Sequence, residues 1–282
     1  MRISALPSAR PLLLSLLGFA LAACAATQDV ELEGRDISVA QNAEPAANFA
    51  MSQSITGLVR AAGPSYVTLT VSQVDKQSNS KDDKRGVAVT SGSGFLVDPS
   101  GYVMTAGHVA VAKGNKVSAR AANGRVYSGS VVDILPDNDL ALIKLKGYLG
   151  KAVTPVADNC VARGSTVFSL GKPHAQGDTA RIGQLEAMHF GRAVQYGQFG
   201  YADAMVLRMN TQKGESGGPL FDDRGELIGM VVSTLSDGNG QPLNLAHAVP
   251  ASSIASFLCS HIACTGNWTA LSVQSTGDCS DS

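Results

Sequence analysis

The sequence has few aromatic residues and no surplus of charge of either sign. Aromatic residues make up 5% of the 282 positions, and 22 lysines and arginines face 23 acids, for a formal net charge of −1. A nucleic-acid-binding protein normally carries a basic stripe or patch, often interleaved with aromatic side chains. We therefore expect no nucleic acid among the partners of this protein.

The chain also lacks grouped metal ligands. Its five histidines and five cysteines lie singly, without the H-x-x-H, HExxH or paired-cysteine spacings of zinc sites. We expect no metal and no cofactor. The composition, with 44% hydrophobic residues, 30 glycines and 11 prolines, is that of a globular protein rich in turns and long enough to bury a core.

The only long apolar run is N-terminal. "PLLLSLLGFALAA" follows Arg2 and Arg10 and is too short to span a bilayer comfortably, which is typical of a secretory signal. It ends in "LAAC", which resembles the bacterial lipobox, whose cysteine becomes lipid-modified. We predict a lipoprotein signal peptide over residues 1–23 and an exported bacterial protein, anchored through Cys24 in the outer membrane and facing the periplasm. Ordinary cleavage in "ALA", giving a soluble periplasmic or secreted protein, is the alternative.

Residues 25–50 carry Gln, Asn, Glu, Asp and Ala without strand alternation. Together with the lipidated cysteine, residues 24–50 are predicted to form a flexible tether; a docked N-terminal arm is the alternative. From Ser52, "SQSITGLVRAA" predicts a short helix that Gly63 and Pro64 end. The charged stretch over residues 77–86 predicts an exposed loop.

The remainder reads as one short strand after another. Segments such as "GYVMTAGHVAV" and "GELIGMVVSTL" are separated by Gly, Asn and Asp turns, with no helices between them. This spacing favours an all-β protein over a parallel α/β sheet. Two sets of about six strands, then an amphipathic segment over residues 252–262, predict two six-stranded antiparallel β-barrels with a C-terminal helix. We place this domain at residues 51–265 and a tail at 266–282.

Three residues could form a nucleophilic site. "KGESGGPLF" holds Ser216 in a glycine-rich turn, which is either a plain loop or a turn that presents a nucleophile beside amide N–H groups. His108 follows an apolar strand in "MTAGHVA", and Asp139 begins a buried-looking strand in "DNDLALIKL", where its carboxylate would need a partner. Each is weak evidence alone, but the three together predict a catalytic triad.

The order His108, Asp139, Ser216 is that of the chymotrypsin class. The motifs "SGSGFLVDPSGYVMTAGHV", "DNDLALIKL", "FSLGKP", "KGESGGPL" and "LAHAVP" resemble those of trypsin-like serine proteases, in particular the HtrA (DegP-type) branch, over residues 55–262. The chain departs from that branch by having Glu215 where HtrA proteins have Asn, and we expect no PDZ domain. Trypsins have Asp there, paired with a newly cut N-terminus, but no matching start sequence precedes "GVAVTSGSGF".

The resemblance implies a chymotrypsin fold and a serine endopeptidase that hydrolyses exported or misfolded polypeptides through an acyl-enzyme. His108 would be the base, Asp139 would orient it, and the N–H groups of Gly214 and Ser216 would form the oxyanion hole. The alternative is a catalytically silent pseudoprotease or a chaperone-like lipoprotein binding module. The oligomeric state stays open.

Specificity follows from two further positions. In trypsin-like enzymes the residue six positions before the nucleophile lies at the base of the primary pocket. Here that residue is Asn210, so the pocket would have no buried acid to bind a Lys or Arg side chain of the substrate. The resemblance implies small or medium uncharged side chains. His247 falls at the pocket's far wall, where a protonated ring could favour Glu or Asp; a solvent-facing strand residue is the alternative.

The other cysteines are Cys160, Cys259, Cys264 and Cys279. An even number in an exported domain suggests disulfides, with three possible pairings. In the chymotrypsin fold the C-terminal helix packs near the linker between the barrels, which implies Cys160 with Cys259 and Cys264 with Cys279. The rival pairing, Cys259 with Cys264, requires the helix to end between them.

Overall fold

The computed structural model describes residues 28–32, 35–41, 49–73, 89–148, 150–174 and 177–274, with side chains from residue 56 onward. The predicted signal peptide, Cys24, the predicted loop over residues 77–86 and Cys279 lie outside the described residues. Among the helices that the structure does describe, none has the length and apolar character needed to cross a membrane.

The first β-barrel is closed, antiparallel and six-stranded, in the order β3-β4-β5-β8-β7-β6. Because side chains alternate between the two faces of a strand, β6 buries every second residue while its neighbours face solvent. Phe95, Met104 and Ile143 are fully buried in its interior. Its strands are β3 (Tyr66–Ser72), β4 (Val89–Asp98), β5 (Tyr102–Ala106), β6 (Lys116–Ala121), β7 (Val126–Leu135) and β8 (Leu140–Leu145).

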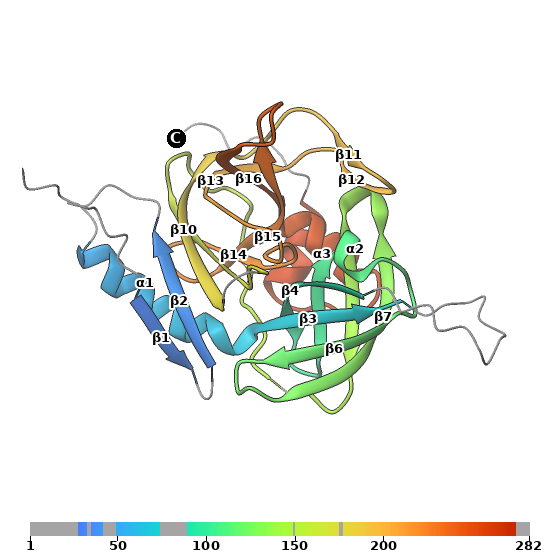
Figure 1. The fold of residues 1–282 in the computed structure, drawn as a ribbon. Helices are drawn as coiled ribbons and strands as arrows, with labels where there is room; N and C mark the ends of the chain where they lie inside the picture. The colour runs from blue at the N-terminus through green and yellow to red at the C-terminus, as the bar shows by residue number, and fades with distance from the viewer. Residues whose placement is uncertain are drawn as a thin grey trace, which may run out of the picture.

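The second barrel closes through the pairing of β10 with β9 and has the order β10-β13-β16-β15-β14-β9. A hairpin, β11 (Val194–Tyr196) and β12 (Phe199–Tyr201), leaves it between β10 and β13 (Figure 1). The prediction of two six-stranded antiparallel barrels is confirmed. The barrel strands are β9 (Thr166–Gly171), β10 (Asp178–Ala187), β13 (Met205–Arg208), β14 (Pro219–Phe221), β15 (Leu227–Ser236) and β16 (Pro242–Pro250).

An N-terminal hairpin is added to the second barrel. β1 (Gln28–Leu32) pairs with β2 (Arg35–Gln41), and β2 pairs in parallel with residues 178–182 of β10. Figure 1 shows the two strands in blue beside α1 (Phe49–Ala62). Residues 28–32 and 35–41 are therefore paired strands, as in the alternative of a docked arm, where a flexible tether was predicted. The physical reason is that the edge of β10 has unpaired backbone N–H and C=O groups. A further strand can pair with these groups whatever side chains it carries.

The predicted helix before the first barrel is confirmed and begins earlier than expected. Helix α1 ends at Ala62, where the 3-10 helix η1 (Gly63–Ser65) begins. Pro64 has no N–H to continue an α-helix, so the helix stops there.

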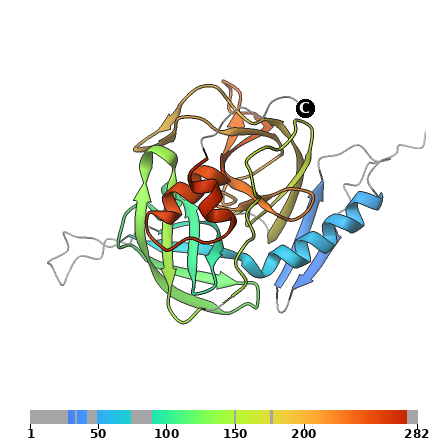
Figure 2. The ribbon, with the colours of Figure 1, turned by 180° about the vertical axis from the view of Figure 1, so that it is seen from behind.

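Two helices cover the back of the molecule (Figure 2). α3 (Ala251–Cys259) contacts β15 and β16 of the second barrel and β8 of the first, and α4 (Asn267–Ser272) packs against it. The buried side chains of Ile254 and Leu258 explain the apolar spacing in this segment. The C-terminal helix is thus confirmed, although it ends at Cys259 and not at Ile262.

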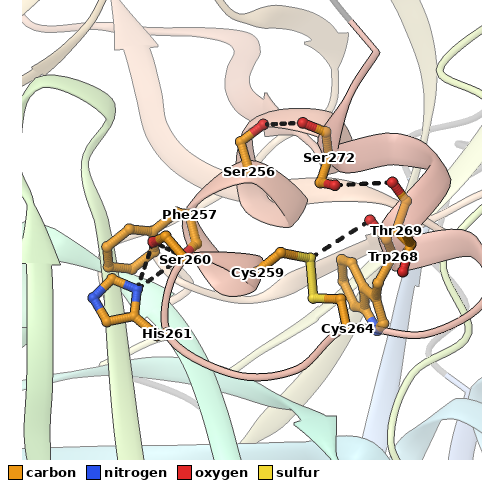
Figure 3. The surroundings of a disulfide bond; sticks show 9 residues. All are labelled: Ser256, Phe257, Cys259, Ser260, His261, Cys264, Trp268, Thr269 and Ser272. Atoms are coloured by element: carbon orange, nitrogen blue, oxygen red, sulfur yellow. Dashed lines mark hydrogen bonds between the residues drawn. A yellow bond between two sulfur atoms is a disulfide. The ribbon is translucent and has the colours of Figure 1, made fainter.

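The predicted disulfide pairing is wrong. Cys259 is bonded to Cys264, with 5.3 Å between the Cα atoms, and Figure 3 shows the bridge beside Trp268 of α4. The physical reason is that α3 ends at Cys259 and the chain turns back, with the N–H groups of His261 and Ile262 both donating to Leu258 O. Cys160 is also disulfide-bonded.

Candidate active site

His108 and Asp139 meet because their strands are neighbours. β5 pairs with β8 with Ala106 opposite Leu140, so the residues just after β5 and just before β8 lie side by side. His108 lies in the short helix α2 (Gly107–Ala110), and Asp139 follows the 3-10 helix η2 (Pro136–Asn138). The structure therefore brings these two predicted site residues together.

Both oxygens of the Asp139 carboxylate bind His108. The backbone N–H of His108 donates to Oδ1 and its Nδ1 donates to Oδ2, each at 2.8 Å. Asp139 is fully buried, whereas 28% of the His108 side chain is exposed. With the ring proton on Nδ1, Nε2 is an acceptor, which is the tautomer that a general base requires.

Glycine is needed beside this pair. A Cβ on Gly107 would lie 3.1 Å from Asp139 Oδ1 and 3.1 Å from the ring of Phe199, closer than side chains normally approach. The Gly107 N–H also donates to Asp139 O at 2.9 Å. Asp139 itself adopts a left-handed conformation, φ 50°, which Asp tolerates better than most residues. The turn that positions the carboxylate thus depends on local backbone geometry.

Ser216 lies in a turn between β13 and β14. Gly214 and Gly217 have φ of 100° and 85°, which only glycine adopts easily, and a Cβ on Gly214 would collide with Lys172 O. The first barrel holds this turn through Ser93, whose N–H donates to Ser216 O and whose hydroxyl donates to Gly214 O, each at 2.9 Å. The turn is therefore fixed across the interface of the barrels.

The Ser216 hydroxyl donates to Val232 O at 3.2 Å, and no hydrogen bond to His108 is present among the described residues. Nor do the N–H groups of Gly214 and Ser216 donate to any acceptor within that part of the chain. The structure thus joins two members of the predicted triad by hydrogen bonds. It places the third in a turn in which the Gly214 and Ser216 N–H groups have no hydrogen-bond acceptor among the described residues.

The acid before the nucleophile has a partner that the sequence analysis missed. Glu215 is 2% exposed, and Arg181 Nε of β10 donates to its Oε1 at 2.8 Å, while the Gln212 N–H donates to Oε2 at 2.7 Å. Burial raises the pKa of Glu215, and the attraction of Arg181 opposes that rise. Arg181 is thus the cation that pairs with Glu215 in this chain. Its lone charge within the apolar strand "TARIGQL" was the available signal.

The two residues that were predicted to set specificity lie in different surroundings. Asn210 is half-buried, whereas His247 of β16 is 2% exposed, so the solvent-facing interpretation of His247 is wrong. His247 Nδ1 is 2.8 Å from the Tyr201 hydroxyl, and the ring of Phe190 lies 4.3 Å away. Burial lowers the pKa of His247, and the nearby charge of Arg192 lowers it further. The ring is therefore neutral at pH 7.

Tyr196 of β11 was also missed by the sequence analysis. Its hydroxyl donates to Asp139 Oδ2, the oxygen that already accepts from His108. Tyr196 ends the short strand β11, and no motif in the local sequence marks it. Among the described residues there is no group of three or more His, Cys, Asp or Glu side chains that could hold a metal.

Comparison with known proteins identifies the domain. Residues 92–230 match the family model of the trypsin-like peptidase domain. The probable periplasmic serine endoprotease DegP-like of Brucella suis is 32% identical over 183 residues, which cover 61% of this chain and 34% of that protein. Protease Do-like 5, chloroplastic, of Arabidopsis thaliana is 28% identical over 215 residues, covering 70% of this chain and 66% of the relative. The chain thus spans about a third of the length of the Brucella protein.

Solved structures agree with the fold. The HtrA-type protease AlgW with a tripeptide is 25% identical, with a TM-score of 0.61 over 73% of this chain and 62% of that one. The inactive form of Rv3671c from M. tuberculosis is 25% identical, with a TM-score of 0.59 over 79% of this chain and 98% of the other. The chain has a chymotrypsin fold, and the resemblance to HtrA proteins is confirmed.

Proposed function

We propose that this chain, which carries a trypsin-like peptidase domain over residues 92–230, is a serine endopeptidase. The observation that carries the proposal is the buried carboxylate of Asp139, which holds His108 through both oxygens. A glycine-rich turn with Ser216 completes the set of groups that acyl transfer requires. The names of the relatives, serine endoprotease and protease, support it.

The reaction would begin when the Ser216 hydroxyl turns from Val232 O toward His108 Nε2. His108 accepts the hydroxyl proton while Ser216 Oγ attacks the peptide carbonyl carbon, and Asp139 stabilises the imidazolium. His108 then returns the proton to the leaving amine, and water hydrolyses the acyl-enzyme by the same route.

The N–H groups of Gly214 and Ser216 would bind the oxyanion of each tetrahedral intermediate. Losing one such donor costs about 10²- to 10³-fold in rate in serine proteases. The contacts of Ser93 and of the Arg181–Glu215 pair keep the turn formed in the absence of substrate. With these contacts, the Ser216 turn does not require a newly cut N-terminus to pair with Glu215.

The substrates we propose are exported or misfolded polypeptides. The names of the DegP-like relatives, periplasmic serine endoproteases, support the choice of exported polypeptides. Asn210, the residue predicted at the pocket base, is uncharged, and burial lowers the pKa of His247, so neither is expected to attract a charged side chain. We therefore propose cleavage after small or medium uncharged residues. Cleavage-site profiling that returned mainly Lys, Arg or Glu would contradict this preference.

We further propose that the protein is exported to the periplasm and held at the outer membrane by lipid on Cys24. Stable anchoring requires more than one acyl chain, and a lipoprotein cysteine carries three. The measurement is labelling with palmitate in wild type and Cys24→Ser. Absent label in wild type, or equal label in both proteins, would remove the anchor and leave a soluble exported enzyme.

The test of activity uses the full chain with a fluorophosphonate probe and with denatured casein. We expect wild type to label and to cleave, Ser216→Ala to do neither, and Ser130→Ala, which changes an exposed serine of β7, to match wild type. Circular dichroism checks that each protein is folded. A folded wild type that neither labels nor cleaves would refute the proposed function.

A further inference from the structure

The hairpin β11–β12, residues 194–201, reaches from the second barrel to the acid–base pair of the first; we call it the cross-barrel hairpin. Both ribbon views show it beside the loops of the first barrel near α2 (Figures 1 and 2). β12 contacts η2, the ring of Phe199 lies against Gly107, and Gln198 Nε2 donates to Val111 O at 3.3 Å. The hairpin thus covers the two turns that present His108 and Asp139.

Tyr196 makes the closest chemical contact of this hairpin. Its hydroxyl donates to Asp139 Oδ2, so the buried carboxylate has three donors, two from His108 and one from the other barrel. Burial and the charge of Asp139 both raise the pKa of Tyr196, so its hydroxyl stays protonated and can only be the donor here.

The Tyr196 ring is held from both sides. Its centroid lies 5.7 Å from the His108 ring and 6.1 Å from the Tyr201 ring, both in edge contacts. Tyr201 is in turn hydrogen-bonded to Ser233 of β15 at 2.9 Å and to His247 of β16 at 2.8 Å. These contacts therefore hold the Tyr196 ring in place and direct its hydroxyl at Asp139.

We infer that Tyr196 is a positioning residue of the acid–base pair: its hydroxyl orients the Asp139 carboxylate and makes that carboxylate less basic. The inference rests on the proposed function. A donor on Oδ2 draws off part of the negative charge that Asp139 presents to the His108 ring. It also blocks rotation of the carboxylate, which keeps both oxygens directed at His108.

Few other charges act on His108. On the elements packed against α2, the titratable groups are those of β4, β5, β7, β8 and η2, and no hydrogen bond or ion pair joins any of them to His108 in the described structure. These groups are Asp98, Tyr102, Tyr127, Asp133, Asp137 and Lys144. Asp139 and Tyr196 are the titratable groups seen in contact with the His108 ring in the described part of the chain.

The experiment compares the full chain carrying Tyr196→Phe with wild type. We expect kcat to fall about tenfold with KM little changed, because the lost hydrogen bond is to a charged group that acts in the transition state. We expect the acidic limb of the kcat/KM profile to move up by roughly half to one pH unit, since the imidazolium gains a more basic partner.

Two controls separate the hydroxyl from the hairpin. Gln198→Ala removes a hairpin contact to the first barrel without touching Asp139, and Tyr127→Phe removes a tyrosine hydroxyl elsewhere in that barrel. Both should keep the acidic limb of wild type. An unmoved limb in Tyr196→Phe, or an equal shift in Gln198→Ala, would overturn the inference.

A second measurement needs no substrate. The low-field NMR resonance of the His108 Nδ1 proton reports the hydrogen bond to Asp139, and its pH titration should move upward in Tyr196→Phe. If wild type proves inactive but this shift is found, the proposed function fails while the contact acts as inferred. If wild type is active and neither the resonance nor the acidic limb moves, only the inference fails.

Discussion

The two barrels build their halves of the candidate site differently. In the first barrel, strand pairing alone places the turns of His108 and Asp139 next to each other, at residues 31 positions apart. In the second, the Ser216 turn is shaped by side chains and backbone from distant elements, namely Ser93 of β4, Lys172 after β9 and Arg181 of β10. The acid–base half is thus a product of sheet register, and the nucleophile half is a product of tertiary contacts.

The largest effect is expected from Asp139→Asn. The amide cannot hold the Nδ1 proton of His108 in the same way, and kcat should fall about ten-thousandfold, as it does for the equivalent change in other triads. The matched control is Asp137→Asn, two residues earlier and exposed, which should keep wild-type kcat. A comparable loss of kcat in both variants would show that Asp139 is not the specific carboxylate that the strand register places against His108.

Arg181→Met tests the other half. It leaves the buried carboxylate of Glu215 without its cation, which costs about 3–5 kcal/mol of unfolding free energy when a buried pair is broken. Labelling of Ser216 by a fluorophosphonate should fall, while the NMR titration of His108 should stay as in wild type. Denaturant unfolding and labelling rates measure the two effects.

The control for Arg181 is Arg208→Met, which removes an arginine paired with Glu186 on the surface and should change stability by less than about 1 kcal/mol. The double variant Arg181→Met, Glu215→Leu should recover stability but not the labelling rate. A His108 titration that moves in Arg181→Met would show that the two halves are not independent.

The bridge between Cys259 and Cys264 follows α3 and belongs to neither half of the candidate site. Removing it with Cys259→Ser and Cys264→Ser should cost about 2 kcal/mol in the chain-entropy view, because the closed loop is short. Activity should be unchanged. Non-reducing peptide mapping should find Cys259 joined to Cys264. Cys259 joined to Cys160 would contradict the structure.

The smallest effect concerns His247 and pH. Its folded pKa lies below the unfolded value, so the unfolded state binds more protons as the pH falls, and stability present above about pH 6.5 is lost as the pH falls through the folded pKa. The slope is at most about 1.4 kcal/mol per pH unit. His247→Phe should remove this part of the acid sensitivity in denaturant unfolding at pH 7.5 and 5. The exposed His174→Phe should retain it.

Patterns in the sequence predicted what depends on neighbours along the chain. The alternation in "KVSARA" predicts a strand that buries one face, and β6 does so; Gly63 and Pro64 predict the end of α1. The pairing of His108 with Asp139 could be predicted because both flank apolar strands and the carboxylate needs a partner. The Ser216 turn could be predicted because positive φ at Gly214 and Gly217 demands glycine.

Contacts between distant segments escaped prediction. The β1–β2 hairpin binds β10 through its backbone, and backbone groups leave no trace in residue identity. The choice of Cys264 over Cys160 as the partner of Cys259 depended on where α3 ends, which apolar spacing locates only to within a turn.

By itself, the sequence determined the all-β class, the two barrels and the residue types of the acid–base pair and the nucleophile, because alternation, glycine turns and buried acids are local constraints. The tertiary structure decided that Tyr196 reaches Asp139, that Arg181 balances Glu215 and that His247 is buried and neutral. Each of these depends on two segments that only folding brings within hydrogen-bond distance, and on the exclusion of water that makes such polar contacts strong.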